Sequence, residues 1–470
     1  MNATELCFLP AAELAAAIRA KRVSPTEAVE AVLDRIATVN PSINALVTVT
    51  EDLARATARD IETRLARGEA AGPLAGVPVT IKDLIMVKGV RTTWGSRIFE
   101  RFVSPEDAPA VERLRAAGAV IVGMTNSPEF GYRATTDNPV FGATRNPWSL
   151  DHTPGGSTGG GAAAVAAGMG PLTIGTDAGG SIRIPSSCCG IVGFKPTLGR
   201  VPMAPVFGGL ETLSHAGPMT RTVRDAALAM SVIAGPDPRD LASLPDDGTD
   251  WARAAEGDLT NVRAAWTPDW GYAPVDPEVR RLAEAAARRL EESGARVDEG
   301  SPRFTDPSDA FNALFPASVA ARLIPYLAEW RAKMDPGLVR YIEMGQRPSA
   351  VDFIQAANVR RTLNDAFREF FKTYDLLLTP TLAAPPLPLG RHMYEEIGDK
   401  AVGALGWLAF TFPINMTGYP AITVPAGWTA AGLPVGLQIV GPRFADAAVL
   451  RAAAAFEARQ PWADRRPTLA

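Results

Sequence analysis

Between residues 76 and 200 the chain alternates short apolar runs with helix-forming stretches, and glycine-rich loops separate them. The run GVPVTI at 76–81 is rich in β-branched residues, and AVIVGM at 119–124 is apolar throughout, which is typical of buried strands. Strands that are apolar on both faces belong to sheets covered by helices on both sides. We therefore predict an α/β fold in which a mixed, twisted β-sheet is covered by helices on both faces.

Helical patterns dominate the remainder of the chain. Ser24 to Glu27 combines a capping serine, a proline at the first helical position and a glutamate three residues past the cap, which predicts a helix that ends at Asn40-Pro41. Further helices are predicted over 51–67, 107–117, 222–234, 277–293, most of 307–373 and 446–459, with Thr222 and Asp446 as N-caps. Strands are predicted over 262–266 and 375–379, and AITVPAG and GLQIVGP are predicted to form a hairpin. We expect one α/β domain over 71–470, including a variable helical cap at about 300–400, and a helical extension over 1–70 that packs on it.

The charge pattern argues against several classes of partner. The formal net charge is −4 and the basic residues are scattered, so no surface for nucleic acid is expected and a small neutral substrate fits better. Residues 401–442 carry no formal charge, but prolines interrupt every apolar run before it reaches spanning length, which predicts buried core rather than a membrane segment. The N-terminus shows no signal-peptide pattern. We expect a cytoplasmic monomer or homodimer without nucleic-acid or membrane partners.

Two serines, each in its own glycine-rich loop, are the strongest candidates for chemistry. Ser157 stands in PGGSTGGGAAAVAAG (154–168), and Ser181 follows 24 residues later in GTDAGGSIRIP (175–185). Lys82 ends the run GVPVTIK, where burial can lower its pKa from about 10.4 so that the amine accepts a proton at neutral pH. A solvated lysine at a strand end is the structural alternative.

A hydroxyl both donates and accepts, so Ser157 can relay a proton from Ser181 toward Lys82. Thr158 is a second candidate for the relay, but its branched side chain is stiffer. The structural alternative for Ser157 is to cap the helix that starts near Gly161.

The loop before Ser181 offers a candidate oxyanion hole. Paired glycines leave backbone N–H groups sterically open, so the amides of Ala178, Gly179 and Gly180 can point toward one oxyanion. A tight turn before the next element is the alternative. The residue types therefore predict acyl transfer by a serine nucleophile without histidine, and no metal or cofactor is expected. The three cysteines (Cys7, Cys188 and Cys189) form neither a disulfide framework nor a zinc motif.

Two other site classes share parts of these motifs. Residues 155–159 satisfy the G-x-S-x-G pattern of α/β-hydrolases, but the preceding NPWSLDHTP is not an apolar strand, and only His215 and His392 could complete a triad. The same glycines could hold a phosphate at a helix N-terminus, yet neither a Walker lysine nor a strand followed by G-x-G-x-x-G is present. We therefore favour a serine nucleophile with a lysine base.

The motifs together resemble the amidase signature family. PGGSTGGGAAAVAAG and GTDAGGSIRIPSSCCGIVGFKPTLGRVP carry the resemblance, and GVPVTIKDL, GMTNSPEFG, RTVRDAALAMSVIAG and the AITVPAG to GLQIVGP segment extend it over most of the chain. The resemblance implies hydrolysis of amides, and in some members of esters or carbamates, by Lys82 as base, Ser157 as a relay whose peptide bond is cis, and Ser181 as nucleophile. It also implies that Asp177 and Arg183 form an ionic pair that braces the nucleophile loop.

The chain departs from the common family pattern at Thr158, where serine is usual, and at Gly161, where serine or glutamate often stands. The substrate is expected to be a small neutral amide, anilide or carbamate, with pocket walls drawn from loops outside the signature. The candidates for those walls are Trp94, Tyr132, Phe141, Phe207, Phe315 and the cap. The resemblance leaves open a glutamine-hydrolysing amidotransferase subunit in a tRNA-dependent complex, and a catalytically silent binding protein of the same fold.

Overall fold

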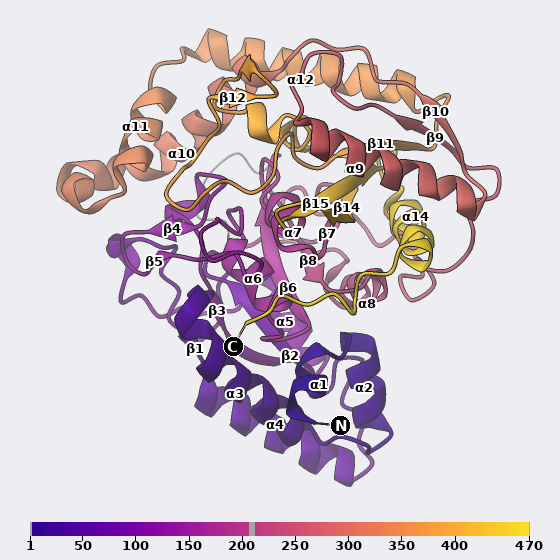
Figure 1. Cartoon of the computed structure of the whole chain (residues 1–470). Coiled ribbons are helices and arrows are strands. Elements are labelled where there is room, and N and C mark those ends of the chain that lie inside the picture. The colour runs from indigo at the N-terminus through magenta and orange to yellow at the C-terminus, as the bar shows by residue number, and fades with distance from the viewer. Residues whose placement is uncertain (1, 206–211, 470) are drawn as a thin grey trace.

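The computed structural model describes residues 2–205 and 212–469, and within them one large sheet of 11 strands runs through the molecule (Figure 1). Parallel pairs (β2 with β3 and β6, β9 with β10 and β11) and antiparallel pairs occur in the same sheet. The predicted mixed α/β fold is therefore confirmed. The strands in spatial order are β1 (Leu46–Val49), β3 (Val120–Thr125), β2 (Pro78–Lys82), β6 (Leu172–Asp177), β8 (His215–Thr220), β7 (Val192–Lys195), β14 (Ala421–Trp428), β15 (Pro434–Val440), β11 (Leu376–Pro380), β9 (Arg263–Trp266) and β10 (Arg296–Glu299).

The helices follow the expected segments closely, with two corrections. The described helices are α1 (Ala3–Phe8), α2 (Ala11–Arg19), α3 (Pro25–Ile43), α4 (Glu51–Ala66), α5 (Pro109–Ala116), α6 (Gly159–Ala166), α7 (Arg183–Cys189), α8 (Val223–Ile233), α9 (Pro277–Arg288), α10 (Ser308–Trp330), α11 (Pro336–Gly345), α12 (Ala350–Phe370), α13 (Phe412–Thr417) and α14 (Asp446–Arg459). The prediction that the first long helix ends at Asn40-Pro41 is wrong: α3 continues to Ile43, because the N–H of Asn44 closes the last turn on the Asn40 carbonyl at 2.7 Å.

Asp446 is not the N-cap of α14, as the sequence had suggested, but its first helical residue. Its carboxylate instead accepts hydrogen bonds from the backbone N–H and the Oγ1 of Thr197, both at 2.7 Å. The acidic side chain thus ties α14 to the chain that follows β7. A cap would have turned the carboxylate onto the helix's own first turn.

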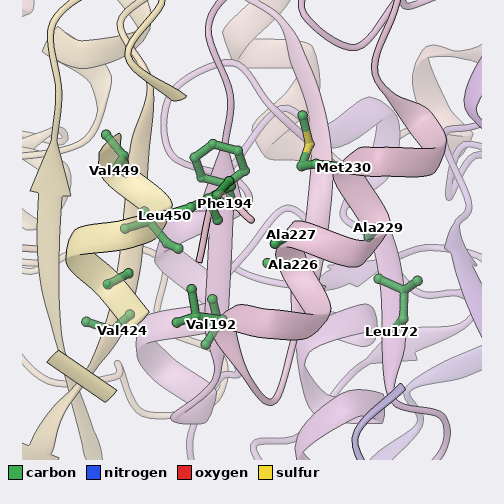
Figure 2. Close-up of a cluster of buried hydrophobic side chains, with 14 of the residues drawn as sticks. Leu172, Val192, Phe194, Ala226, Ala227, Ala229, Met230, Val424, Val449 and Leu450 are labelled. Carbon is green, nitrogen blue, oxygen red and sulfur yellow. The ribbon is translucent and has the colours of Figure 1, made fainter. Parts of the chain in front are cut away.

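Alternation along the strands decides which side chains face which helical layer. In β2, Val79 and Ile81 belong to the large apolar cluster between the sheet and α8, α9 and α14. Figure 2 shows this cluster, with α8 and α14 packing over strands that carry Val192, Phe194 and Val424. Because successive strand side chains point to opposite faces, Thr80 and Lys82 face the other layer, which contains α6 and α7.

The cap and the N-terminal segment lie at opposite ends of the molecule (Figure 1). The cap helices α11 and α12 both pack on α10, and α10 and α11 enclose a second apolar cluster together with Trp94, Phe130 and Tyr132. The N-terminal segment is not purely helical, because Leu46–Val49 forms β1 at the edge of the sheet. The Asp225 carboxylate of α8 further anchors this segment by accepting the N–H groups of Ala11 and Ala12 at 2.8 and 2.9 Å.

Of the segment 401–442 that was expected to be core, residues 407–440 contain α13, β14 and β15 and are mostly buried. Residues 401–406 are exposed or partly exposed, so the prediction is wrong for them. Among the described residues, no helix has the combination of length and apolar character needed to cross a bilayer.

Candidate active site

Lys82 lies at the carboxyl end of β2 with its side chain fully enclosed, at 0% exposure. Its Nζ donates to the Ser157 Oγ at 2.7 Å and to the Thr176 Oγ1 at 2.9 Å. Burial lowers the pKa of Lys82 to about 7, against an opposing effect of the nearby Asp177 carboxylate. The amine is therefore neutral in about half of the molecules near pH 7, which is what a lysine base requires.

Ser157 sits in the turn that leads into α6, and its hydroxyl is buried beside the lysine. The peptide bond between Gly156 and Ser157 is cis, as the family resemblance implied. Gly156 has to be glycine here, because a Cβ would lie 2.9 Å from the backbone of Ala134 and Thr135. Thr158 directs its Oγ1 to the Thr176 carbonyl at 3.3 Å, so it supports the loop rather than competing for the lysine.

Ser181 follows β6 and lines a cavity, next to Gly179 and Ile184. The backbone N–H of Thr158 donates to the Ser181 carbonyl at 3.2 Å, so the two glycine-rich loops lie directly against each other. The structure thus brings Ser157 into contact with Lys82 and sets the Ser157 loop against the Ser181 loop. Within the described residues, no hydrogen bond joins the Ser181 hydroxyl to Ser157 or Lys82.

Asp177 and Arg183 form the expected ion pair under the Ser181 loop. The Nε and Nη2 of Arg183 donate to the two Asp177 carboxylate oxygens at 3.0 and 3.1 Å, and both side chains are fully buried. Burial alone would raise the pKa of Asp177, but the Arg183 guanidinium holds it well below its usual range. Gln438 and Asn415 accept further hydrogen bonds from Arg183, both at 2.6 Å. The guanidinium is therefore fixed from both sides.

The predicted oxyanion hole needs one correction. The N–H of Gly180 donates to the Asp177 Oδ1 at 2.6 Å, so in this structure it braces the loop instead of facing the cavity. Gly180 has a φ of +126°, and a Cβ there would lie 2.4 Å from the Thr411 Oγ1, so only glycine fits. Ala178 and Gly179 remain the candidate donors.

The cavity over Ser181 has a volume of about 590 Å³ and mostly apolar walls. Of the aromatic candidates from the sequence, Tyr132 and Phe315 line it. Trp94 packs on Phe99 and does not line the cavity, Phe141 lies beneath the Arg91 guanidinium, and Phe207 falls outside the described residues. The cap, also expected as a wall, contributes Phe311, Tyr341 and Met344. Apolar lining residues that the sequence did not single out include Ile184, Leu405, Trp407 and Leu408.

One side of the cavity is charged, and this feature was missed at the sequence level. Arg133 forms ion pairs with Asp137 and with Asp335, the latter at 3.0 Å, and the Tyr132 hydroxyl donates to the Asp335 Oδ1 at 3.0 Å. Asp335 is also the N-cap of α11, where it accepts the N–H of Gly337 at 2.7 Å. The Asp335-Pro336 pair is a helix-start signal that sequence reasoning could have used.

The geometry does not fit the α/β-hydrolase alternative. No described strand immediately precedes Ser157, so the nucleophile elbow of an α/β-hydrolase is not formed. His215 hydrogen-bonds only to the carbonyls of Leu213 and Asp177 within the described residues, and His392 to Thr135 and Arg133. Neither histidine reaches a serine of the site. In the same residues no group of three potential protein metal ligands is found.

Comparison with known proteins identifies the family. Residues 27–450 match the family described as Amidase, so the chain belongs to the amidase family and is a hydrolase that acts on carbon–nitrogen bonds. It is 41% identical to an acylamidase of Rhodococcus erythropolis over 473 residues, which cover 99% of this chain and 98% of that protein. It is also 37% identical to a glutamyl-tRNA(Gln) amidotransferase subunit from Carboxydothermus hydrogenoformans, over 99% of this chain and 100% of that one.

A crystal structure agrees with this assignment. A bacterial aryl acylamidase of the amidase signature enzymes is similar with a TM-score of 0.92 and 35% identity, covering 98% of this chain and 99% of the other. The resemblance inferred from the two glycine-rich motifs is thereby confirmed.

Proposed function

We propose that the enzyme hydrolyses the C–N bond of a small neutral amide, anilide or carbamate through an acyl-enzyme on Ser181. The observation that carries the proposal is the 2.7 Å contact between the buried Lys82 Nζ and the Ser157 Oγ, next to the cavity that Ser181 lines. A lysine whose pKa is lowered to about 7 by burial can hold the proton that a serine nucleophile must lose.

Each residue then has a defined step. Ser181 attacks the carbonyl carbon while its proton passes to Ser157, and the Ser157 proton passes to the neutral Lys82. The amides of Ala178 and Gly179 stabilise the oxyanion, and the Asp177–Arg183 pair keeps their loop in place. Collapse of the intermediate returns a proton through Ser157 to the leaving nitrogen, and water attacks the acyl-enzyme by the same route.

The walls of the cavity support the proposed substrate class. Phe311, Phe315 and Trp407 provide aromatic surface, and Leu405 and Leu408 add aliphatic surface. Such walls favour an aryl or alkyl group, since burial of apolar surface contributes about 25 cal/mol per Å². The acylamidase names among the relatives agree with this class. Carbamates are included, and we propose esters as an additional substrate class, because the same acyl-enzyme chemistry applies to amide, carbamate and ester carbonyl groups.

A second candidate function follows from the full-length similarity to the glutamyl-tRNA(Gln) amidotransferase protein. In that case the chain would hydrolyse glutamine only within a complex. The scattered basic residues argue for the stand-alone enzyme.

The test is turnover by the purified chain alone. We expect release of 4-nitroaniline from acyl 4-nitroanilides and of the matching amine from aryl carbamates, followed by absorbance and mass spectrometry. No turnover across the panel, together with glutamine hydrolysis that appears only when amidotransferase partner proteins are added, would establish the second function. A protein whose Ser181 is not labelled by a fluorophosphonate would be a silent binding protein.

A further inference from the structure

Glu129 is a fully buried carboxylate that the proposed reaction does not use. It belongs to a short 3₁₀ turn, η2 (Glu129–Gly131), and its side chain is 0% exposed. Its Oε1 accepts the Ser96 hydroxyl at 2.6 Å, and its Oε2 accepts the backbone N–H of Asp335 at 2.7 Å. One side chain therefore joins the sheet-side loop at Ser96, the turn η2 and the N-cap residue of the cap helix α11.

The turn that carries Glu129 also touches the proton relay. Gly131, two residues later, has a φ of +71°, and a Cβ on it would lie 3.2 Å from the Ser157 Oγ and 2.7 Å from a methyl group of Leu84. The backbone of η2 is thus packed against the relay hydroxyl without a side chain between them. The backbone of η2 forms the surface that keeps the Ser157 hydroxyl directed at Lys82, so a small shift of η2 would displace that surface.

We infer that Glu129 is a positioning residue that couples the docking of the cap to the geometry of the Ser157 relay. The inference rests on the proposed function, because it assigns Glu129 a role in that reaction. Asp335 takes part from the other side: its backbone N–H holds Glu129, and its carboxylate holds Tyr132 and Arg133 on the pocket wall. One connected set of hydrogen bonds therefore fixes the N-terminus of α11 and the turn η2.

The chain offers matched variants that isolate the hydrogen bond between Glu129 and the Asp335 N–H. Glu129→Gln keeps an oxygen for the Asp335 N–H and a donor for the Ser96 Oγ, whereas Glu129→Ala removes both contacts. Asp335 has a φ of −58° and ψ of 126°, so Asp335→Pro fits the backbone while deleting the N–H. Met334 before it is extended, with ψ of 158°, which a following proline tolerates. Asp335→Ala loses the same carboxylate but keeps the N–H.

The measurements are kcat and KM on an acyl 4-nitroanilide, the rate of Ser181 labelling by a fluorophosphonate, and the melting temperature. We expect Glu129→Ala to lower both kcat and the labelling rate at least about tenfold, and Glu129→Gln to restore most of the loss, because a buried N–H left without its acceptor costs about this much. Asp335→Pro should have a kcat at least about tenfold below that of Asp335→Ala, and this difference should vanish in a Glu129→Ala background.

Several outcomes would overturn the inference. One is a Glu129→Ala variant whose kcat is normal and whose KM or melting temperature alone changes. The others are an equal kcat for Asp335→Pro and Asp335→Ala, and a Glu129→Gln variant that restores none of the lost activity. Failure of the proposed function is distinguishable, because it would show in the unmodified enzyme as absent amide turnover. The labelling rate still tests Glu129 in that case.

Discussion

The rate of amide hydrolysis should rise with pH through a midpoint near 7, because Lys82 must be neutral to accept the proton. Burial lowers its pKa from 10.5 to about 7, so at pH 7 about half of the molecules carry the free amine, against about one in 3,000 for an ordinary lysine. For a single titration at pH 7, kcat/KM at pH 8 should exceed that at pH 6 about tenfold. Above pH 8 the rate should level off.

The assay is the initial rate of 4-nitroaniline release between pH 5.5 and 9, with folding checked by circular dichroism at each pH. Asp83 and Glu129 are buried carboxyls whose pKa burial raises to about 7, so both titrate in the same range. The rise of the rate with pH should persist in Asp83→Asn and Glu129→Gln.

Lys82→Ala should lower kcat by about two to four orders of magnitude, and Lys88→Ala, which changes an exposed lysine, should leave the pH profile unchanged. A flat profile in the active enzyme, or near-normal turnover by Lys82→Ala, would refute the assignment of the base.

Three further results are expected. Ser181→Ala should abolish both turnover and fluorophosphonate labelling while leaving the melting temperature within a few degrees; residual labelling at the same site by mass spectrometry would point to another nucleophile. Gly131→Ala should lower kcat more than it raises KM, because its Cβ would lie 3.2 Å from the Ser157 Oγ, and steady-state kinetics with an unchanged kcat would contradict this. Asp177→Asn leaves the buried guanidinium of Arg183 without its counter-charge and should lower the free energy of unfolding by about 3–5 kcal/mol, measured by urea denaturation; a change below about 1 kcal/mol would mean that the pair does not brace the loop.

The parts of the fold that could be predicted from the sequence are those with a local signal. The apolar runs at 76–81 and 119–124 became β2 and β3, and the hairpin of β14 and β15 lies where its two runs and glycine turn indicated. The strand β1 was missed because the helices on either side of it dominated the pattern of the N-terminal segment. The end of α3 was misplaced because proline removes only its own N–H from the last turn, and that turn closes without it.

The candidate site, like the fold, has parts that the sequence could predict and parts that it could not. Lys82, Ser157 and Ser181 could be proposed from residue type and glycine context, with the family resemblance deciding against the structural alternatives, because the proposed chemistry needs a buried amine and two hydroxyls. The pocket could not, because its walls come from segments that only tertiary packing brings together: Tyr132 and Asp335 are 203 positions apart, yet they share a hydrogen bond. Trp94 and Phe315 were equal candidates for the pocket wall by residue type. Only the position of the cap shows that Phe315 lines the pocket and Trp94 belongs to the core.

Side chains alternate between the two faces of β2, and this alternation places Lys82, the proposed base, in the candidate site. Val79 and Ile81 point into the apolar cluster under α8, so Lys82 is forced onto the opposite face, toward α6 and the loop of Ser157. A shift of β2 by one residue would place Lys82 in the apolar cluster and Ile81 beside the serine. β2 pairs in parallel on both sides, with β3 and with β6, which fixes that register. Burial at this position makes the charged lysine unfavourable and so lowers its pKa. The central sheet therefore sets the protonation state on which the proposed mechanism depends.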